Sequence, residues 1–228
     1  MSQRIAYYIS AHGYGHAARS VPVLEKLIRD YTVTLKTEIP AEFFRGYLRG
    51  AYSLIPQAVD AGCAQGNFVH IDAAQCFRNL RRFLETQPER LDAEIRWLRE
   101  NRIDLILSDA ASLPLQAGQN LGIPSLLLAN FTWHDIYSGL PGAEENISLI
   151  ETLRGEYATA TLQFLPQCHI ANAITTRQQE VGFIALQGRN VRQELQRFLD
   201  RPLAGKTLVF IYLGEADSSC LRWERLPE

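Results

Sequence analysis

The sequence lacks an excess of either charge. Its 228 residues include 23 lysines and arginines and 25 aspartates and glutamates, which leaves a net charge of −2 at pH 7. Proteins that bind nucleic acids or anionic membranes usually carry a cluster of positive charge. We therefore expect no nucleic-acid partner. The longest apolar runs are only as long as a β-strand, so we also expect no transmembrane segment.

Paired cysteines and an export signal are missing as well. The N-terminus has no basic stretch followed by an apolar segment and a small-residue cleavage site. No two cysteines form a CxxC pair or have the spacing of a zinc site. The four are Cys63, Cys76, Cys168 and Cys220. Together these absences predict reduced thiols in a cytoplasmic protein.

What the sequence does contain is a loop rich in glycine and histidine between a strand and a helix. Residues 5–9 are apolar, and an amphipathic helical pattern begins near residue 17. The loop between them holds His12, Gly13, Gly15 and His16. Glycines let a ligand approach the backbone, and the N–H groups at a helix N-terminus favour negative or polarised oxygen. The loop is therefore a candidate binding site.

Strand patterns alternate with helical patterns along most of the chain, without internal repeats. Further strands are expected at 32–37, 52–56, 103–108, 125–129 and 162–165. A helical segment at 72–102 is interrupted by Pro88, and Thr86 and Glu89 have capping-box spacing, so we expect two helices or one kinked helix there. This alternation predicts an α/β fold with a doubly wound, Rossmann-like parallel sheet.

This fold brings distant polar residues together. The first and fourth strands of a doubly wound sheet lie side by side at the point where ligands bind. His16 follows the first strand, Asp109 ends the fourth and Asn130 ends the fifth. A neutral imidazole can accept a proton near pH 7, and a carboxylate on its other nitrogen fixes the tautomer. We predict a general base, His16, oriented by Asp109, although Asp109 could instead simply cap the next helix.

The same loop allows two other interpretations. Residues 13–18 fit the GxGxxA pattern, and Glu38 lies where a ribose-binding acid is found in dinucleotide sites. A bulky imidazole at the pyrophosphate position argues against this NAD(P) site. His12 and His16 are four residues apart and could bind a metal, but no third ligand is obvious.

Two more segments are expected at this edge of the sheet. Trp133, beside His134, is interpreted as the wall of a cleft, because an indole ring can stack on a sugar while its N–H stays hydrated. Phe131 is interpreted as a core residue. Residues 57–71 form a long loop without periodicity, which we expect to be a mobile lid.

Three segments, at 9–19, 106–109 and 130–137, resemble the glycosyltransferase-like N-terminal region of plant L-arabinokinase and its bacterial relatives. More distantly, the chain is similar to GT-B glycosyltransferases, including plant-type UDP-sugar transferases and the N-acetylglucosaminyltransferase of peptidoglycan synthesis. The resemblance implies a GT-B N-terminal domain over residues 1–186. It implies a linker helix and the first strand of a truncated second domain over 187–228.

The resemblance also implies roles for the predicted site residues. The plant-type enzymes use a histidine base after the first strand and an orienting aspartate after the fourth, which match His16 and Asp109. Loops after the fifth strand bind the acceptor, which implicates Asn130, Trp133 and His134. We assign substrate binding to the glycine loop as well, at His12, Gly13 and Gly15, although His12 has no counterpart in those enzymes. No metal and no cofactor are implied.

In GT-B enzymes the second domain holds most of the nucleotide sugar. We therefore expect an acceptor-side half that moves a hexosyl group from a nucleotide sugar to an unknown acceptor once a separate donor domain is supplied. A non-catalytic sugar- or nucleotide-binding module is the alternative. Residues 207–213 predict a strand buried on both faces. We expect this segment to dock on the first domain, to associate with another copy, or to be poorly ordered.

Overall fold

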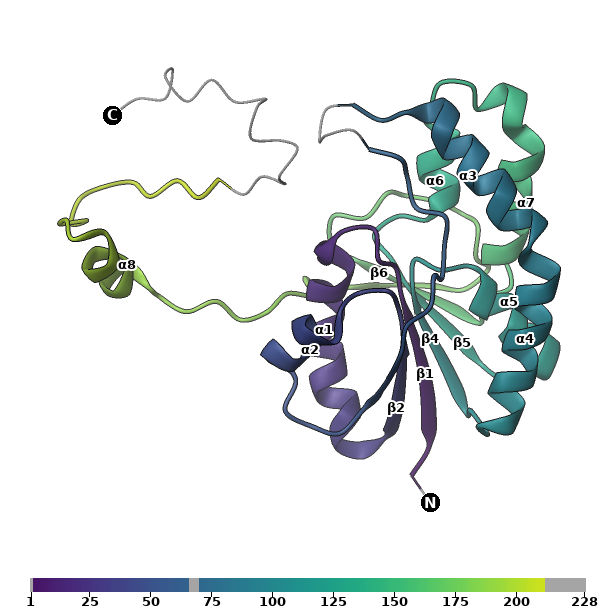
Figure 1. The fold of residues 1–228 in the computed structure, drawn as a ribbon, viewed down its shortest axis with the longest axis horizontal. Helices are drawn as coiled ribbons and strands as arrows, with labels where there is room; N and C mark the ends of the chain where they lie inside the picture. Colours follow the sequence, from purple (N-terminus) through teal and green to yellow (C-terminus); the bar gives the residue numbers. More distant parts are fainter. Residues whose placement is uncertain (1, 66–69, 212–228) are drawn as a thin grey trace.

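The computed structural model describes residues 2–65 and 70–211. Within these residues, seven parallel strands form one sheet in the order β3-β2-β1-β4-β5-β6-β7 (Figure 1). The strands are β1 (Arg4–Ile9), β2 (Thr32–Lys36), β3 (Ser53–Ile55), β4 (Leu105–Asp109), β5 (Ser125–Leu128), β6 (Leu162–Pro166) and β7 (Gln178–Val181). The predicted α/β fold with a doubly wound parallel sheet is confirmed.

Helices cover both faces of the sheet. Figure 1 shows α1 and α2 on one side and α3, α4, α5 and α7 on the other. The helices are α1 (Tyr14–Asp30), α2 (Ala41–Tyr47), α3 (Ala73–Glu85), α4 (Gln87–Glu100), α5 (Leu113–Leu121), α6 (Trp133–Ser138), α7 (Ile147–Tyr157) and α8 (Arg192–Leu199), with a 3-10 turn at Glu144–Asn146. No helix in the described part of the chain is long and apolar enough to cross a membrane.

Strand β1 lies at the centre of the core. Its residues Ile5, Tyr7 and Ile9 pack in the cluster that includes α1, whereas Ala6 and Tyr8 pack in the cluster that includes α4. All five are buried. A strand buried on both faces is typical of the middle of a parallel sheet. This packing holds the loop after β1 at the carboxyl edge of the sheet.

The helical segment 72–102 divides as predicted, but not through the predicted capping box. Helix α3 ends at Glu85 and α4 begins at Gln87. The hydroxyl of Thr86 donates to the carbonyl oxygens of Arg82 at 3.4 Å and Phe83 at 3.1 Å. Thr86 is both the C-cap residue of α3 and the N-cap residue of α4. Its hydroxyl satisfies the free carbonyls of α3, so it does not cap α4.

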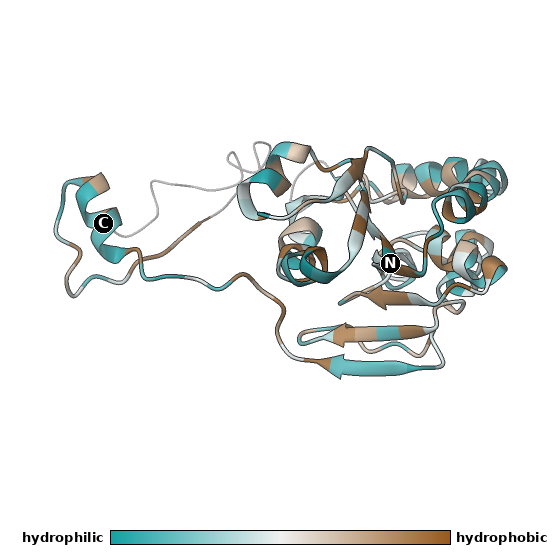
Figure 2. Cartoon of the chain, turned by 90° about the horizontal axis from the view of Figure 1, so that it is seen from below, coloured by the Kyte–Doolittle hydropathy of each residue, from teal (hydrophilic) through white to brown (hydrophobic). Residues whose placement is uncertain are grey.

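The end of the described chain differs from the prediction. Residues 178–181 form β7, a polar edge strand (teal in Figure 2) that is not among the strands expected from the sequence, because it has no apolar periodicity. Residues 207–211 form no strand, and residues 212 and 213 lie outside the described residues. A strand needs a neighbour for its backbone hydrogen bonds, and this segment has none among the residues described. The expected strand is therefore wrong over 207–211.

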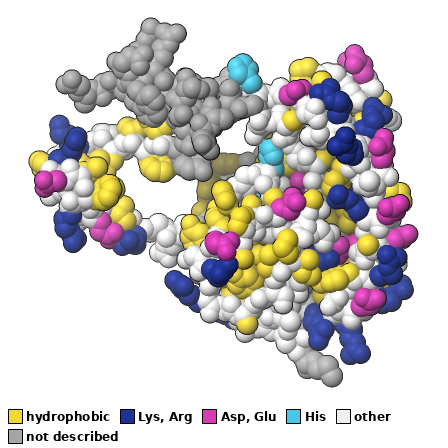
Figure 3. All heavy atoms as spheres, in the orientation of Figure 1, with side chains coloured by type: hydrophobic (Ala, Val, Ile, Leu, Met, Phe, Trp, Pro, Cys, Tyr) yellow, Lys and Arg dark blue, Asp and Glu magenta, His cyan; other side chains and the backbone are white. Residues whose placement is uncertain are grey.

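Apolar side chains are exposed in this C-terminal part. Figure 1 shows α8 standing away from the sheet, and Figure 3 shows hydrophobic side chains on its surface. The side chain of Phe198 is 84% exposed and that of Phe210 is 89% exposed. In the described residues, the segment after β7 therefore contributes little to the core.

Candidate active site

His16 and Asp109 are in contact at the carboxyl edge of the sheet. His16 lies in the first turn of α1, directly after the β1 loop, and Asp109 is the last residue of β4. The two strands are paired in register, with Ile9 opposite Asp109. The Nδ1 atom of His16 lies 2.7 Å from Oδ1 of Asp109. Asp109 is completely buried and His16 is nearly so.

Arg19 is a third member of this contact that we did not predict as a site residue. It lies one turn after His16 on α1, and its Nε–H donates to Asp109 Oδ2 at 3.0 Å while its terminal NH2 group donates to Oδ1. Burial alone would raise the pKa of Asp109, but the hydrogen bond from His16 and the charge of Arg19 hold it below its usual value. The carboxylate is therefore ionised near pH 7, so Nδ1 of His16 carries the proton that it donates.

The glycine loop leaves backbone uncovered beside this pair. Gly13 precedes α1 with φ of +79°, a conformation that other residues rarely adopt. A side chain at Gly13 or Gly15 would meet no atom within 4 Å of its Cβ. Both glycines are exposed. The N-terminal backbone of α1 is thus accessible, and its binding of a polar ligand stays a prediction.

Asn130 contacts Arg19 beside the pair and uses its side chain within the protein. Its Oδ1 accepts a hydrogen bond from Arg19, and its Nδ2 donates to the carbonyl oxygens of Pro166 at 3.4 Å and Gln167 at 3.0 Å. The amide therefore ties α1 to the loops after β5 and β6. A direct role of Asn130 in substrate binding stays a prediction.

Trp133 is not the exposed cleft wall that we predicted. Its side chain is only 3% exposed and packs in a cluster with Tyr137 and Phe77. Its indole ring contacts the imidazole of His12 edge to face, with 5.2 Å between the ring centroids. A buried ring in this position packs against His12 from the protein interior and cannot stack on a sugar. Phe131, which we predicted to be a core residue, is instead partly exposed and contacts the ring of His16 edge to face at 5.7 Å.

His12 is held by the loop that follows β3. The backbone N–H of Cys63 donates to His12 Nδ1 at 3.4 Å, so this nitrogen is unprotonated. A Cβ at Gly62 would lie 3.1 Å from the same nitrogen, so the loop approaches closely. Burial lowers the pKa of His12. His12 is therefore a neutral imidazole, with its lone pair on Nδ1 facing the protein.

The same loop brings in a carboxylate that the sequence did not single out. Asp60 lies near both imidazoles, and burial raises its pKa, although Ser10 and Trp133 lower it in part. The residue is partly exposed, but its Oδ2 is shut off from solvent and makes no hydrogen bond of ordinary geometry to any described residue. No motif marks Asp60, because it lies in a loop without periodicity.

Part of the predicted lid packs against the site. Val59 is buried, and the hydroxyl of Tyr137 donates to the carbonyl oxygen of Gly62 at 2.6 Å. Residues 66–69 lie outside the described residues. The mobility of the segment 57–71 stays a prediction, but residues 57–65 pack against the site residues.

His134 lies at the start of α6, behind a well-formed helix cap. Thr132 Oγ1 accepts from the backbone N–H of Asp135 at 3.3 Å, and the Asp135 carboxylate accepts from the backbone N–H of Thr132 at 2.7 Å. The Nδ1 atom of His134 lies 3.6 Å from Asp135. Its role in substrate binding is a prediction.

In residues 2–65 and 70–211, no group of three histidine, cysteine, aspartate or glutamate side chains could hold a metal ion.

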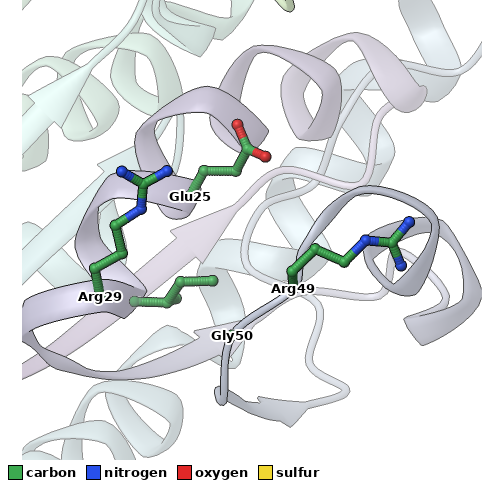
Figure 4. Close-up of a pocket in the computed structure, with 5 residues that line it drawn as sticks. Glu25, Arg29, Arg49 and Gly50 are labelled. Atoms are coloured by element: carbon green, nitrogen blue, oxygen red, sulfur yellow. The ribbon is translucent and has the colours of Figure 1, made fainter.

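A cavity of about 270 Å³ is lined by Arg29 and Glu25 of α1 and by Arg49 (Figure 4). Arg29 is thirteen residues along α1 from His16, about 20 Å at 1.5 Å per residue. This cavity is therefore separate from the candidate active site.

The sequence is similar to one curated relative, and no family model matches the chain. It is 30% identical over 139 residues to L-arabinokinase of Arabidopsis thaliana. The match takes up 58% of this chain and 13% of that protein. The chain therefore corresponds to a small part of the relative.

The fold is similar to solved glycosyltransferases of the GT-B type. One is Phytolacca americana UGT2 complexed with UDP-2-fluoroglucose and pterostilbene, with a TM-score of 0.52, 14% identity, and coverage of 86% of this chain and 57% of that one. Another is a Polygonum tinctorium UDP-glucosyltransferase capable of glucosylating indoxyl, with a TM-score of 0.54, 14% identity, and coverage of 88% and 56%. The chain thus has the Rossmann-like fold of these enzymes and spans a little over half of their length.

Proposed function

We propose that this chain is the acceptor-side half of a GT-B-type glycosyltransferase that moves a hexosyl group from a nucleotide sugar. The observation that carries the proposal is the contact of His16 with Asp109 at the carboxyl edge of the sheet. The Nε2 atom of His16 makes no hydrogen bond within the described part of the chain. It is therefore available to a substrate.

The chemistry of the pair is that of a general base. Nε2 of His16 takes the proton of an acceptor hydroxyl while the hydroxyl oxygen bonds to the anomeric carbon of the donor sugar. The bond from that carbon to the phosphate oxygen breaks, and the nucleotide leaves with the bonding electrons. Asp109 stabilises the imidazolium that forms and keeps the ring oriented. The N–H groups of the first turn of α1, which have no partner within the helix, bind substrate oxygens.

The proposed division of the chain follows the same scheme. Residues 1–186 form the acceptor domain, and residues 187–228 lead toward a separate donor domain. The proposed setting is the cytoplasm, where nucleotide sugars and reduced cysteines are both found. The coverage of just over half of the solved GT-B chains supports this division.

Binding and transfer are tested separately. A ligand that binds the folded state raises the melting temperature. We expect sugars of the acceptor type to raise it, and Asp109→Asn to reduce the effect. Asp104→Asn is a matched control, because Asp104 lies next to the other end of β4 and accepts from the backbone N–H of Arg4. A shift with NAD would favour the dinucleotide site instead. Sugar binding without nucleotide release in the presence of a donor half would favour a non-catalytic module.

A further inference from the structure

Arg19 gives Asp109 a positive partner that does not depend on His16. Its guanidinium donates to both carboxylate oxygens, and the hydroxyl of Ser20 donates to Oδ2 at 3.0 Å. The side chain of Arg19 is 12% exposed and that of Asp109 is fully buried. Water and salt therefore screen this ion pair little. The positive charge of Arg19 therefore compensates the negative charge of the Asp109 carboxylate without a contribution from His16.

This balance decides which protonation state of His16 is favoured. With Arg19 charged and Asp109 ionised, a neutral His16 leaves the buried cluster without net charge. A protonated His16 leaves one uncompensated positive charge, which is costly where little water is present. In an isolated pair of histidine and aspartate the order reverses, because the imidazolium then balances the carboxylate.

Two other titratable groups face His16. Asp60, from the loop after β3, attracts a positive charge on either imidazole, and His12, from the loop after β1, repels it. Burial raises the pKa of Asp60 and lowers the pKa of His12, so both are driven toward their neutral forms. Their opposing effects on His16 are weakened accordingly. Arg19 and Asp109, by contrast, are in direct contact with Nδ1 of His16, at 3.5 Å and 2.7 Å.

We propose that Arg19 is a positioning residue that fixes Asp109 and keeps His16 neutral, with its proton on Nδ1 and its lone pair on Nε2. A base can accept a proton only in this state, so Arg19 prevents Asp109 from leaving His16 already protonated. The bond from Arg19 to Asn130 also holds the loop after β5 against the pair. The inference rests on the proposed role of His16, but its test needs no substrate.

The test is the ¹⁵N NMR spectrum of the His16 imidazole in the full chain at pH 7, which distinguishes the neutral Nδ1–H form from the doubly protonated form. The wild type is expected to be neutral. Arg19→Met removes the charge and is expected to raise the ratio of protonated to neutral His16 by about tenfold or more. Arg19→Lys keeps the charge and is expected to resemble the wild type. Arg19→Met combined with Asp109→Asn removes both charges and is expected to restore the neutral ring.

A folded Arg19→Met protein with His16 as neutral as in the wild type overturns the proposal, and so does Arg19→Lys behaving like Arg19→Met. If Arg19→Met does not fold, Arg19→Gln repeats the measurement with a neutral donor. Unfolding of both variants while Arg19→Lys folds would show that Arg19 serves the fold alone, which also overturns the proposal. A neutral His16 in a protein without transferase activity would remove the proposed function and leave this inference standing.

Discussion

The imidazole of His16 and the carboxylate of Asp109 lie 2.7 Å apart although the residues are 93 positions apart in the sequence. The contact depends on the pairing of β1 with β4, which places the ends of these two strands side by side. Asp109 contacts no solvent, and Arg19, Ser20 and His16 supply all of its side-chain hydrogen bonds among the described residues.

Asp109→Ala is expected to lower the free energy of unfolding by about 3–5 kcal/mol, because it leaves the buried Arg19 without its counter-charge. Asp104→Ala, at an exposed position next to the other end of β4, is expected to cost less than about 1 kcal/mol. Urea unfolding of the two variants measures the difference. Equal and small losses would show that the Arg19–Asp109 pair does not stabilise the fold.

The stability that Asp109 provides is expected to depend on pH. Its pKa is lower in the folded protein than in the unfolded chain, so its contribution is fully present above the unfolded value. The contribution is lost as the pH falls through the folded value. The stability difference between wild type and Asp109→Asn should therefore shrink as the protein is acidified. A difference that stays constant from neutral to strongly acidic pH contradicts the assignment.

Asp60→Asn is expected to have the opposite pH dependence. Burial raises the pKa of Asp60, so the folded state is destabilised once the pH rises above the ordinary carboxyl range. The variant removes this cost and is expected to melt at a higher temperature than the wild type at pH 7. The advantage should disappear in acid, where the carboxyl is protonated in both states. Melting curves across this pH range test the prediction, and a less stable variant at neutral pH would refute it.

Substitutions of the two loop glycines are expected to have opposite effects. Gly13→Ala places a Cβ at φ of +79° and is expected to cost about 1–2 kcal/mol. Gly15→Ala lies inside α1 with open space around it and is expected to be neutral or to stabilise by up to about 1 kcal/mol. Thermal unfolding compares the two. Similar losses in both variants would mean that the backbone of Gly13 is not the constraint.

The sequence predicts most of the strands and the His16–Asp109 contact, because strand order in a doubly wound sheet is nearly fixed by topology. Arg19 lies within the motif, but nothing in the motif shows that its side chain turns toward Asp109. Asp60 was missed because a loop has no periodicity from which its direction could be read.

The burial of Trp133 and the strands at the end of the described chain also differ from what the sequence predicts. Trp133 follows a strand, where both an exposed and a buried ring are common, and only packing against His12 and Tyr137 decides between them. Strand β7 consists of three polar residues and a valine, so its pairing with β6 leaves no apolar pattern. Residues 207–211 have the composition of a buried strand without a sheet to join.

The most direct test of the proposed function is nucleotide release from a panel of nucleotide sugars by this chain combined with the donor half of a GT-B enzyme. His16→Gln is expected to slow release by about 10²–10⁴-fold, the usual contribution of a general base. Asp104→Asn is expected to leave the rate unchanged, and the chain without a donor half is expected to release nothing. Release at the wild-type rate by the complemented His16→Gln protein would contradict the role of His16. Release by the repurified chain alone would contradict its assignment as an acceptor-side half.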